Sequence, residues 1–306
     1  MKLGHISDLH LLDLREPHPR DFMNKRFLGG VNLLLNRGDD HSAGVVREAL
    51  DHLEQRDVDH IAITGDLTNL ALESEFAAVA DLLAEIPSAD GRVSVVPGNH
   101  DYYTPDAVEA GYFEKHFAPY LESDLPEYQL ERGYPFCKLI GDVALVGMNT
   151  GVPTPWFFAT GEVGDHEIEA TEALLEDPEI RDRFTVVMLH HHLVPFEHSR
   201  VEFTRRLVNA SDVLDLLRRH RVELAIHGHN HHFATIEIPH LEGDGALKIC
   251  EAGSTSLSDY RDPKFGGKYN IYHIHDGRLD KIETHLYEGE DLGFVRWRER
   301  TFEKAV

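Results

Sequence analysis

The chain has 306 residues, of which 42% are hydrophobic, and its formal net charge is −24. This length suits one large α/β domain with insertions, and the hydrophobic share is sufficient for a core. Non-specific binding of long nucleic acids depends on lysines and arginines that displace counterions, so this charge disfavours it, whereas a small anionic substrate could bind where metal ions supply positive charge.

Short apolar runs along the chain, each ending in a polar and often glycine-containing turn, predict strands. Stretches with apolar residues at helical spacing lie between several of these runs, and the first of them opens on Ser42, which predicts an N-cap. The predicted strands are 2–10, 59–68, 92–101, 142–150, 184–192, 222–232, 246–254 and 268–278, and the predicted helices are 42–56, 73–86, 166–177 and 205–220.

This alternation of strands and helices predicts an α/β fold. The last strands lack long helical spacers, and His-Asp-Gly-Arg at 275–278 predicts a hairpin turn, so the second half of the sheet is expected to be mixed or antiparallel. No internal repeat or low-complexity linker interrupts the chain. We therefore expect a single domain over residues 1–306, with an insertion at about 11–40 and a C-terminal extension at about 279–306.

The two added segments allow more than one interpretation. The insertion could be a lid or a hydrophobic wall near a site, or a helix that packs on the domain; its two central glycines argue against a membrane-surface helix. The segment 290–306 could hold copies of the chain together in a homo-oligomer, or could pack on its own domain.

The cysteine content and the beginning of the chain bear on its location. Cys137 and Cys250 lie in apolar, strand-like surroundings, which predicts buried free thiols and no disulfide or cysteine zinc site. The first residues turn polar from His5 onward, unlike a secretion signal, and no segment has the roughly 20 apolar residues of a membrane-spanning helix. We therefore expect a cytoplasmic protein.

Side chains with metal-binding chemistry gather at the carboxyl ends of five predicted strands. Ligands of open α/β sheets bind beyond these ends. Residues i and i+2 of a strand share a face, so two D-x-H or H-x-H side chains can point at one place. The residues are Asp8 and His10, then Asp66, then Asn99, His100 and Asp101, then His190, His191 and His192, and finally His229 and His231.

Carboxylates, imidazoles and an amide oxygen suit borderline metals such as Mn, Fe, Co or Zn. The candidate ligands are too many for one ion, whereas two ions could be held if one carboxylate bridges them, for which Asp66 is the natural choice. Two metals about 3.5–4 Å apart can share a bridging hydroxide and clamp a phosphoryl group for in-line attack. The sequence therefore predicts a site for two metal ions.

The order of these motifs resembles the calcineurin-like metallophosphoesterase superfamily. Its signature is D-x-H, then G-D, then G-N-H-D/E, then a histidine at a strand end, and then G-H-x-H. All five blocks occur in this order between residues 8 and 231. They are Asp8-Leu9-His10, Gly65-Asp66, Gly98-Asn99-His100-Asp101, His190 and Gly228-His229-Asn230-His231.

This resemblance implies a fold and a role for each motif residue. The fold would be a four-layer αββα sandwich with mixed sheets. One metal would be held by Asp8, His10, Asp66 and His231, and the other by Asp66, Asn99, His190 and His229. His100 would be catalytic and not a ligand: it would contact the phosphoryl group, stabilise its developing charge or protonate the leaving oxygen. Asp101 would orient its neighbours or stabilise a turn.

The implied activity is hydrolysis of a small phosphoester by a metal-bridging hydroxide that attacks phosphorus. The Asp8-Leu9-His10 start and the block from His190 to Pro195 resemble the bacterial branch of cyclic-nucleotide or glycerophosphodiester phosphodiesterases, so we expect a phosphodiesterase. His192 and Leu193 replace two prolines of that branch, a departure that concerns the substrate pocket and not the metals. A phosphomonoesterase, a nuclease or a non-catalytic scaffold such as the retromer subunit of this fold are the alternatives; a scaffold would be expected to lose ligands.

Histidines outside the motif positions have weaker interpretations. His191 would point to the opposite face of its strand, either supporting a ligand or simply packed there. His192 and His198 could line the substrate mouth but are expected in a solvated loop, and His227 could support a ligand from behind. His232 is expected to be exposed, and His41 has no motif that would place it at the site.

Overall fold

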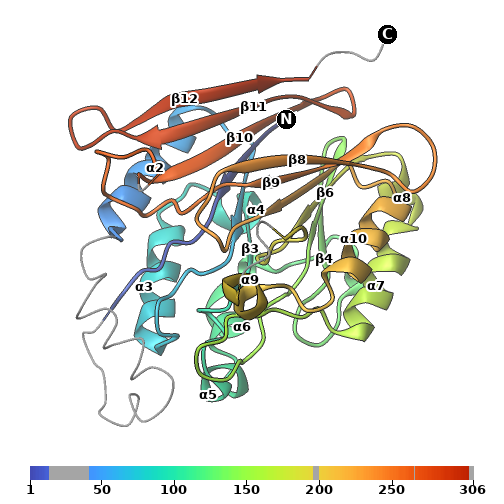
Figure 1. Cartoon of the computed structure of the whole chain (residues 1–306), viewed down its shortest axis with the longest axis horizontal. Helices are drawn as coiled ribbons and strands as arrows, with labels where there is room; N and C mark the ends of the chain where they lie inside the picture. Colours follow the sequence, from blue (N-terminus) through green and yellow to red (C-terminus); the bar gives the residue numbers. More distant parts are fainter. Residues whose placement is uncertain (14–40, 196–199, 265, 303–306) are drawn as a thin grey trace.

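The computed structural model describes residues 1–13, 41–195, 200–264 and 266–302, and its strands form two six-stranded sheets (Figure 1). The first sheet has the order β12-β11-β10-β1-β2-β3, in which β1, β2 and β3 run parallel and β10, β11 and β12 are antiparallel to their neighbours. Its strands are β1 (Lys2–Ile6), β2 (His60–Thr64), β3 (Val93–Val96), β10 (Lys268–His275), β11 (Arg278–Tyr287) and β12 (Phe294–Thr301).

The second sheet has the order β4-β5-β6-β7-β9-β8, with a parallel centre of β5, β6, β7 and β9 and an antiparallel strand at each edge. Both sheets are thus mixed, as predicted. The strands are β4 (Phe136–Ile140), β5 (Val143–Gly147), β6 (Phe184–Met188), β7 (Leu224–His227), β8 (Ala234–Pro239) and β9 (Ala246–Glu251).

Helices cover the outer face of each sheet, so that the molecule has the predicted four layers (Figure 1). The helices α2 (Ala43–Gln55) and α3 (Glu73–Ala84) lie on the first sheet, and α7 (Asp165–Leu175) and α10 (Ala210–Arg219) lie on the second. Shorter helices are α4 (Ala89–Arg92), α5 (Pro105–Glu109), α6 (Tyr112–Phe117), α8 (Pro178–Arg181) and α9 (Arg200–Arg205), with 3₁₀ turns η3 (Ala118–Tyr120) and η4 (Pro126–Tyr128).

The alternation of side chains along β6 explains the layering. Val186 and Met188 belong to a core that also contains residues of the first sheet, whereas Val187 and Leu189 pack in a second core with residues of α7 and α10. Successive residues of a strand point to opposite faces, so a strand with apolar side chains on both faces is covered on both sides. The central strands therefore consist of continuous apolar residues, and these runs are what allowed the strands to be predicted from the sequence.

Two local predictions are confirmed in detail. Ser42 caps α2, since its Oγ accepts a hydrogen bond from the backbone N–H of Val45 at 3.4 Å. Asp276 and Gly277 form the two-residue turn between β10 and β11, with φ of 51° and 68°. Positive φ at both positions is what a type I′ hairpin turn requires.

Four strands were not among those predicted. Three of them lie at sheet edges, β4, β8 and β12, and the fourth, β11, is the second arm of the hairpin whose turn was predicted. An edge strand that buries only part of its surface need not form an apolar run; β12, for example, exposes Arg296, Arg298 and Arg300. The predicted C-terminal extension thus contributes two strands, β11 and β12, to the first sheet. The predicted helix 205–220 is shorter than expected, because α10 begins only at Ala210.

Some predictions concern residues that the structure does not describe. The insertion at about 11–40 lies outside the described residues from residue 14 onward, and so does His198. The two cysteines, by contrast, are described, and Cys137 and Cys250 are buried free thiols as predicted. Among the helices that the structure describes, none combines the length and the apolar composition needed to cross a membrane.

His60 in β2 predicts a pH dependence of stability. It is 1% exposed, and its Nε2 lies 2.9 Å from Ser94 Oγ. Burial, with the positive charges of Lys138 and Arg92, lowers the pKa of His60 from 6.5 to about 3. The unfolded chain therefore binds a proton below about pH 6.5 that the folded chain does not bind, so this contribution to stability is present above pH 6.5 and is lost as the pH falls toward 3.

We expect His60→Gln to flatten the acid-induced loss of stability. The difference from wild type should approach about 1.4 kcal/mol per pH unit in this range, because one proton is no longer taken up on unfolding. Urea unfolding between about pH 7 and pH 4 measures it. His166→Gln is the matched control, since His166 is exposed on α7. Equal slopes for His60→Gln and wild type would contradict the prediction.

Candidate metal centre

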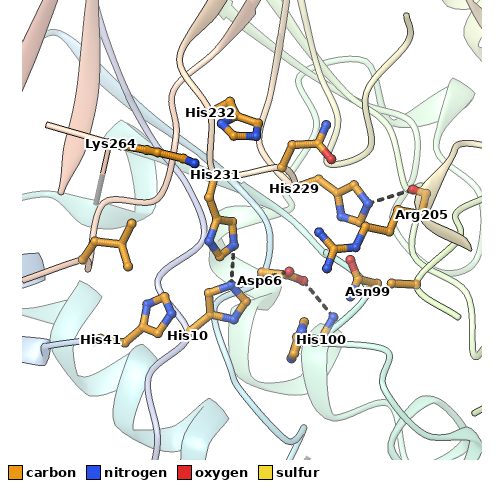
Figure 2. A pocket seen from close by; sticks show the side chains of 13 residues that line it. His10, His41, Asp66, Asn99, His100, Arg205, His229, His231, His232 and Lys264 are labelled. Atoms are coloured by element: carbon orange, nitrogen blue, oxygen red, sulfur yellow. Dashed lines mark hydrogen bonds and ion pairs between the residues drawn. The ribbon is translucent and has the colours of Figure 1, made fainter. Parts of the chain in front are cut away.

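The carboxyl ends of β1, β2, β3, β6 and β7 meet at one cavity of about 410 Å³ (Figure 2). Five of the seven expected metal ligands line it together with His100: His10, Asp66, Asn99, His229 and His231. The other two, Asp8 and His190, are fully buried beside them. The fold thus brings together residues that are up to 223 positions apart in the sequence.

The D-x-H and H-x-H motifs do not lie in strands, contrary to the prediction. β1 already ends at Ile6 and β7 at His227. The residues that follow are in left-handed conformations, with φ of 53° at Asp8, 46° at His10, 51° at Asp66, 82° at His229 and 58° at His231. Side chains in such turns converge because the backbone curls, and not because an extended strand places i and i+2 on one face.

Left-handed conformations are costly for residues with a Cβ and occur where surrounding structure enforces them. Two backbone hydrogen bonds do so here: Asp8 N–H donates to Gly65 O at 3.0 Å, and His10 N–H donates to Asp66 O at 2.9 Å. Gly65 itself has φ of 86°, and a Cβ there would meet the backbone of Gly98 at 2.6 Å. The G-D motif therefore needs its glycine for close approach of the neighbouring loop.

One group of candidate ligand atoms surrounds His190. Its Nδ1 lies 2.7 Å from the carbonyl oxygen of Thr64, which accepts the Nδ1 proton and turns Nε2 toward the site. This Nε2 lies 3.3 Å from Asp66 Oδ2, 3.2 Å from Asn99 Oδ1 and 3.2 Å from His229 Nδ1. A single proton on Nε2 could serve only one of these three acceptors, whereas a metal ion could contact all of them.

His229 is oriented in the same way. Its Nε2 donates to the carbonyl oxygen of Arg205 at 2.7 Å, so that Nδ1 carries the lone pair that faces His190. Its backbone N–H lies 3.1 Å from both carboxylate oxygens of Asp8. The bond to Arg205 leaves Nδ1 as the ring nitrogen that could bind a cation, together with Asp66 and His190.

The second group of candidate ligand atoms surrounds His10. Its Nε2 lies 3.0 Å from His231 Nε2, 3.8 Å from Asp66 Oδ2 and 3.9 Å from Asp8 Oδ1. His231 Nε2 is also 3.4 Å from Asp8 Oδ1. Asp66 Oδ2 is thus close to both groups, the position that a bridging carboxylate requires.

The charges of the buried groups suit a cation. Although burial raises the pKa of Asp66, the His190 and His100 imidazoles hold it well below its usual value. Burial, with the nearby His100, lowers the pKa of His10, and burial, with His191, lowers that of His229. Burial also lowers the pKa of His190, but Asp66 outweighs it and raises this pKa to about 9. A metal ion that binds here would displace the His190 proton.

His100 is fixed at the cavity by two contacts. Its backbone N–H donates to Asp66 Oδ1 at 2.7 Å (Figure 2), and its Nδ1 donates to the carbonyl oxygen of Asn69 at 2.7 Å. Its ring packs edge-on against His10, with 4.7 Å between the centroids. The imidazole is therefore held beside the ligand groups, with Nε2 as the atom that can exchange a proton with a substrate.

Asp101 joins the two loops that carry Asp66 and Asn99. Its carboxylate accepts from the backbone N–H groups of Gly98 at 2.9 Å, Leu67 at 3.2 Å and Thr68 at 2.9 Å, and from Thr68 Oγ1 at 2.9 Å. The same hydrogen bonds thus serve both roles considered for Asp101: they orient the neighbouring residues and they stabilise the turn.

Glu251, at the end of β9, is a site residue that the sequence did not indicate. It is fully buried, and its Oε1 accepts from the backbone N–H groups of Asn230 at 3.1 Å and His232 at 3.0 Å. These two amides flank His231, so one carboxylate oxygen holds the left-handed turn that carries this expected ligand. In the sequence, Glu251 lies within the predicted strand 246–254, and it belongs to no motif.

His41 also lies at the site, contrary to the prediction. Its ring packs edge-on against His10, with 4.8 Å between the centroids, and its Nδ1 lies 2.6 Å from Ser256 Oγ. Ser256 Oγ in turn donates to the carbonyl oxygen of Asp8 at 3.1 Å. Arg205 and Lys264 line the same cavity, and neither belongs to a sequence motif (Figure 2).

Four further histidines are close neighbours of the expected ligands in the sequence. His191 is buried and does not line the cavity. Its Nδ1 lies 2.8 Å from Thr150 Oγ1, and its ring packs against that of His229 with 4.4 Å between the centroids. His192 is buried and contacts Glu202 Oε1 at 2.7 Å, so the prediction of a solvated loop residue is wrong. His227 is buried, with its Nδ1 3.0 Å from the adjacent Gly228 O. His232 is exposed, as predicted, but it also lines the cavity.

Comparisons with known proteins bear on this geometry. The family described as calcineurin-like phosphoesterase matches residues 1–233. No curated protein matches the chain. Among solved structures, the purple acid phosphatase PPD1 from yellow lupin (Lupinus luteus) seeds superimposes with a TM-score of 0.64 at 12% identity, over 98% of this chain and 53% of the lupin chain. The chain thus spans about half the length of the lupin protein, and this likeness shows the fold alone.

Two further proteins superimpose less closely. TT1561 of Thermus thermophilus gives a TM-score of 0.48 at 14% identity, over 91% of this chain and 96% of that one. Wild-type Vps29 from Entamoeba histolytica, solved as a complex with Zn²⁺, gives 0.43 at 14% identity, over 99% of this chain and 100% of that one. Neither similarity is close enough to support a functional conclusion.

Proposed function

The chain belongs to the calcineurin-like phosphoesterase family, and on this premise we propose that it is a phosphodiesterase that works with two metal ions. The observation that carries the proposal is the position of Asp66 between two groups of ligand atoms, 3.3 Å from His190 Nε2 and 3.8 Å from His10 Nε2. One carboxylate can bridge two ions only from such a position.

The donor chemistry fits the ions that the proposal requires. One ion would be held by Asp8, His10, Asp66 and His231, and the other by Asp66, Asn99, His190 and His229. Nitrogen and oxygen donors without a thiolate suit Mn, Fe, Zn or Co in divalent or trivalent form. When bound, the ions would supply charge neutralisation at the phosphoryl group and a more acidic water molecule as the nucleophile.

The protein's own contribution to the reaction is orientation and proton transfer. The hydrogen bonds of His190 to Thr64 O and of His229 to Arg205 O hold the ligand rings before any ion binds. His100, anchored through Nδ1 to Asn69 O, would donate from Nε2 to the leaving oxygen or to a phosphoryl oxygen. The diester preference is supported by the likeness of the Asp8–His10 and His190–Pro195 blocks to bacterial phosphodiesterases.

The first experiment is hydrolysis of bis-p-nitrophenyl phosphate beside p-nitrophenyl phosphate, with the purified protein loaded with Mn. We expect the diester to have the higher kcat/KM. Preference for the monoester would contradict the proposal and would indicate a phosphomonoesterase instead. Hydrolysis of neither, with two ions bound per chain, would favour the scaffold alternative, although a scaffold needs neither the seven converging ligands nor His100.

Glu251 offers a test of the metal site from outside the ligand set. Glu251→Ala removes the carboxylate that binds the two amides and so holds the turn at His231. We therefore expect metal affinity to fall about 10- to 100-fold. Glu251→Gln keeps one oxygen acceptor and should retain most of the affinity. Titration of the metal-free variants with Mn²⁺ measures the effect. Equal affinities for Glu251→Ala and wild type would contradict this role.

A further inference from the structure

An apolar surface adjoins the cavity of this strongly acidic protein. Among the described residues, nine large hydrophobic side chains are exposed, and four of them belong to two segments, 153–161 and 200–208. We call these four residues the aromatic rim, since three of them are aromatic. They are Trp156 at 49% exposure, Phe157 at 79%, Phe203 at 56% and the aliphatic Val208 at 52%.

The two segments of the rim are bonded to each other. Ala159 N–H donates to Thr204 O at 2.8 Å, Gly161 N–H to Arg206 O at 3.1 Å, and Val208 N–H to Gly161 O at 2.8 Å. The rings of Phe158 and Phe203 contact each other, with 6.4 Å between the centroids. The rim is therefore one surface, although its segments are about 50 residues apart in the sequence.

The same two segments form part of the cavity wall. Ala159 and Arg205 both line the cavity, and Figure 2 shows the Arg205 side chain directed between His229 and Asn99. The carbonyl oxygen of Arg205 accepts the hydrogen bond from the His229 ring. The four rim side chains do not line this cavity themselves. Phe203 and Val208 line a second cavity of about 350 Å³ together with His192, whose ring packs against that of His229 with 5.7 Å between the centroids. The rim therefore lies beside the expected ligand groups and not within their cavity.

Phe157 adds an independent observation. Its φ is 71°, in the left-handed region that bulky residues rarely adopt. With 79% of its surface exposed, this side chain gains little from packing in its own chain. Such conformations cluster at binding and catalytic sites.

We propose that the aromatic rim binds an apolar ester substituent of the substrate, so that the substrate class is an amphiphilic phosphodiester with its phosphoryl group at the metal ligands. The inference rests on the proposed function and specifies its substrate. Four side chains are too few for a stable protein partner, whose interface buries about 800 Å² on each side. The net charge of −24 disfavours docking on an anionic membrane surface.

The test uses p-nitrophenyl alkyl phosphates whose alkyl group grows from methyl to hexyl. Hydrolysis breaks the bond from phosphorus to p-nitrophenolate, and the oxygen of water takes its place, leaving the alkyl phosphate. We expect kcat/KM to rise about twofold or more with each methylene, and about 30-fold from methyl to hexyl, since full burial of a methylene gives up to about fourfold.

Phe157→Gly combined with Phe203→Ala should reduce the gain from methyl to hexyl to less than about fivefold, with kcat/KM for the methyl ester within about twofold of wild type. Glycine adopts positive φ without steric cost, so the melting temperature of Phe157→Gly should equal or exceed that of wild type. Leu241→Ala is the matched control: Leu241 is 45% exposed, beyond the end of β8 that lies away from the site, and its loss should leave the gain intact.

Two results would overturn the inference and leave the proposed function standing. One is hydrolysis of all esters at the same kcat/KM by wild type, and the other is an unchanged chain-length gain in the double variant. Failure to hydrolyse even the methyl ester, with two metal ions bound, would overturn the proposed function and this inference together.

Discussion

Asp66→Ala is expected to reduce turnover by at least about 100-fold, more than the loss of a side chain that only supports a metal ligand. Asp66 lies within 3.8 Å of the nearest imidazole nitrogens of both ligand groups, so its removal weakens both ion sites at once. It also removes the acceptor of the His100 backbone N–H at 2.7 Å. Activity on the p-nitrophenyl diester and metal content per chain, measured together, check this prediction.

Two further variants show whether the loss is specific. Asn99→Ala removes an oxygen from the His190 group alone; we expect it also to reduce turnover by at least about 100-fold while weakening chiefly that ion site. Asp244→Ala removes a carboxylate from the exposed turn between β8 and β9 and should leave both activity and metal content unchanged. Full activity of Asp66→Ala and Asn99→Ala with both metals retained would refute the ligand assignment.

His100→Gln is expected to lower kcat about 10²- to 10⁴-fold, the usual contribution of a general acid or a donor to developing charge. Unlike Asp66→Ala, it should leave two metals bound, because His100 is not among the seven expected ligands. The matched control is His166→Gln, in which an exposed histidine of α7 is replaced and kcat should not change. A His100→Gln protein with wild-type kcat, or one that loses metal, would contradict this role.

Esters whose leaving groups differ in basicity distinguish the two possible contributions of His100, protonation of the leaving oxygen and stabilisation of phosphoryl charge. The hydrolysis of methyl p-nitrophenyl phosphate releases an acidic phenol that needs no proton, whereas methyl phenyl phosphate releases a more basic one. If His100 donates a proton to the leaving oxygen, the loss should be larger for the phenyl ester. If it stabilises charge on the phosphoryl oxygens, both esters should lose about equally.

The central strands and the order of the site motifs could be predicted from the sequence. β6 and β7 are buried on both faces and therefore form continuous apolar runs, and a chemically distinctive residue follows each run. Ser42 and the Asp276-Gly277 turn were also predictable, since a helix cap and a two-residue hairpin depend on local backbone chemistry. The edge strands β4, β8 and β12 were not, because strands at sheet edges need no apolar run.

The sequence by itself determined which residue types reach the ends of the strands, and hence that a metal site with a phosphoester chemistry could form there. The tertiary structure decided how they meet. Asp8 and His231 converge through left-handed turns that hydrogen bonds from other strands enforce, and not through the period of an extended strand. Glu251 and His41 reach the site from segments without a motif, because burial and hydrogen bonds between distant loops have no local pattern in the sequence.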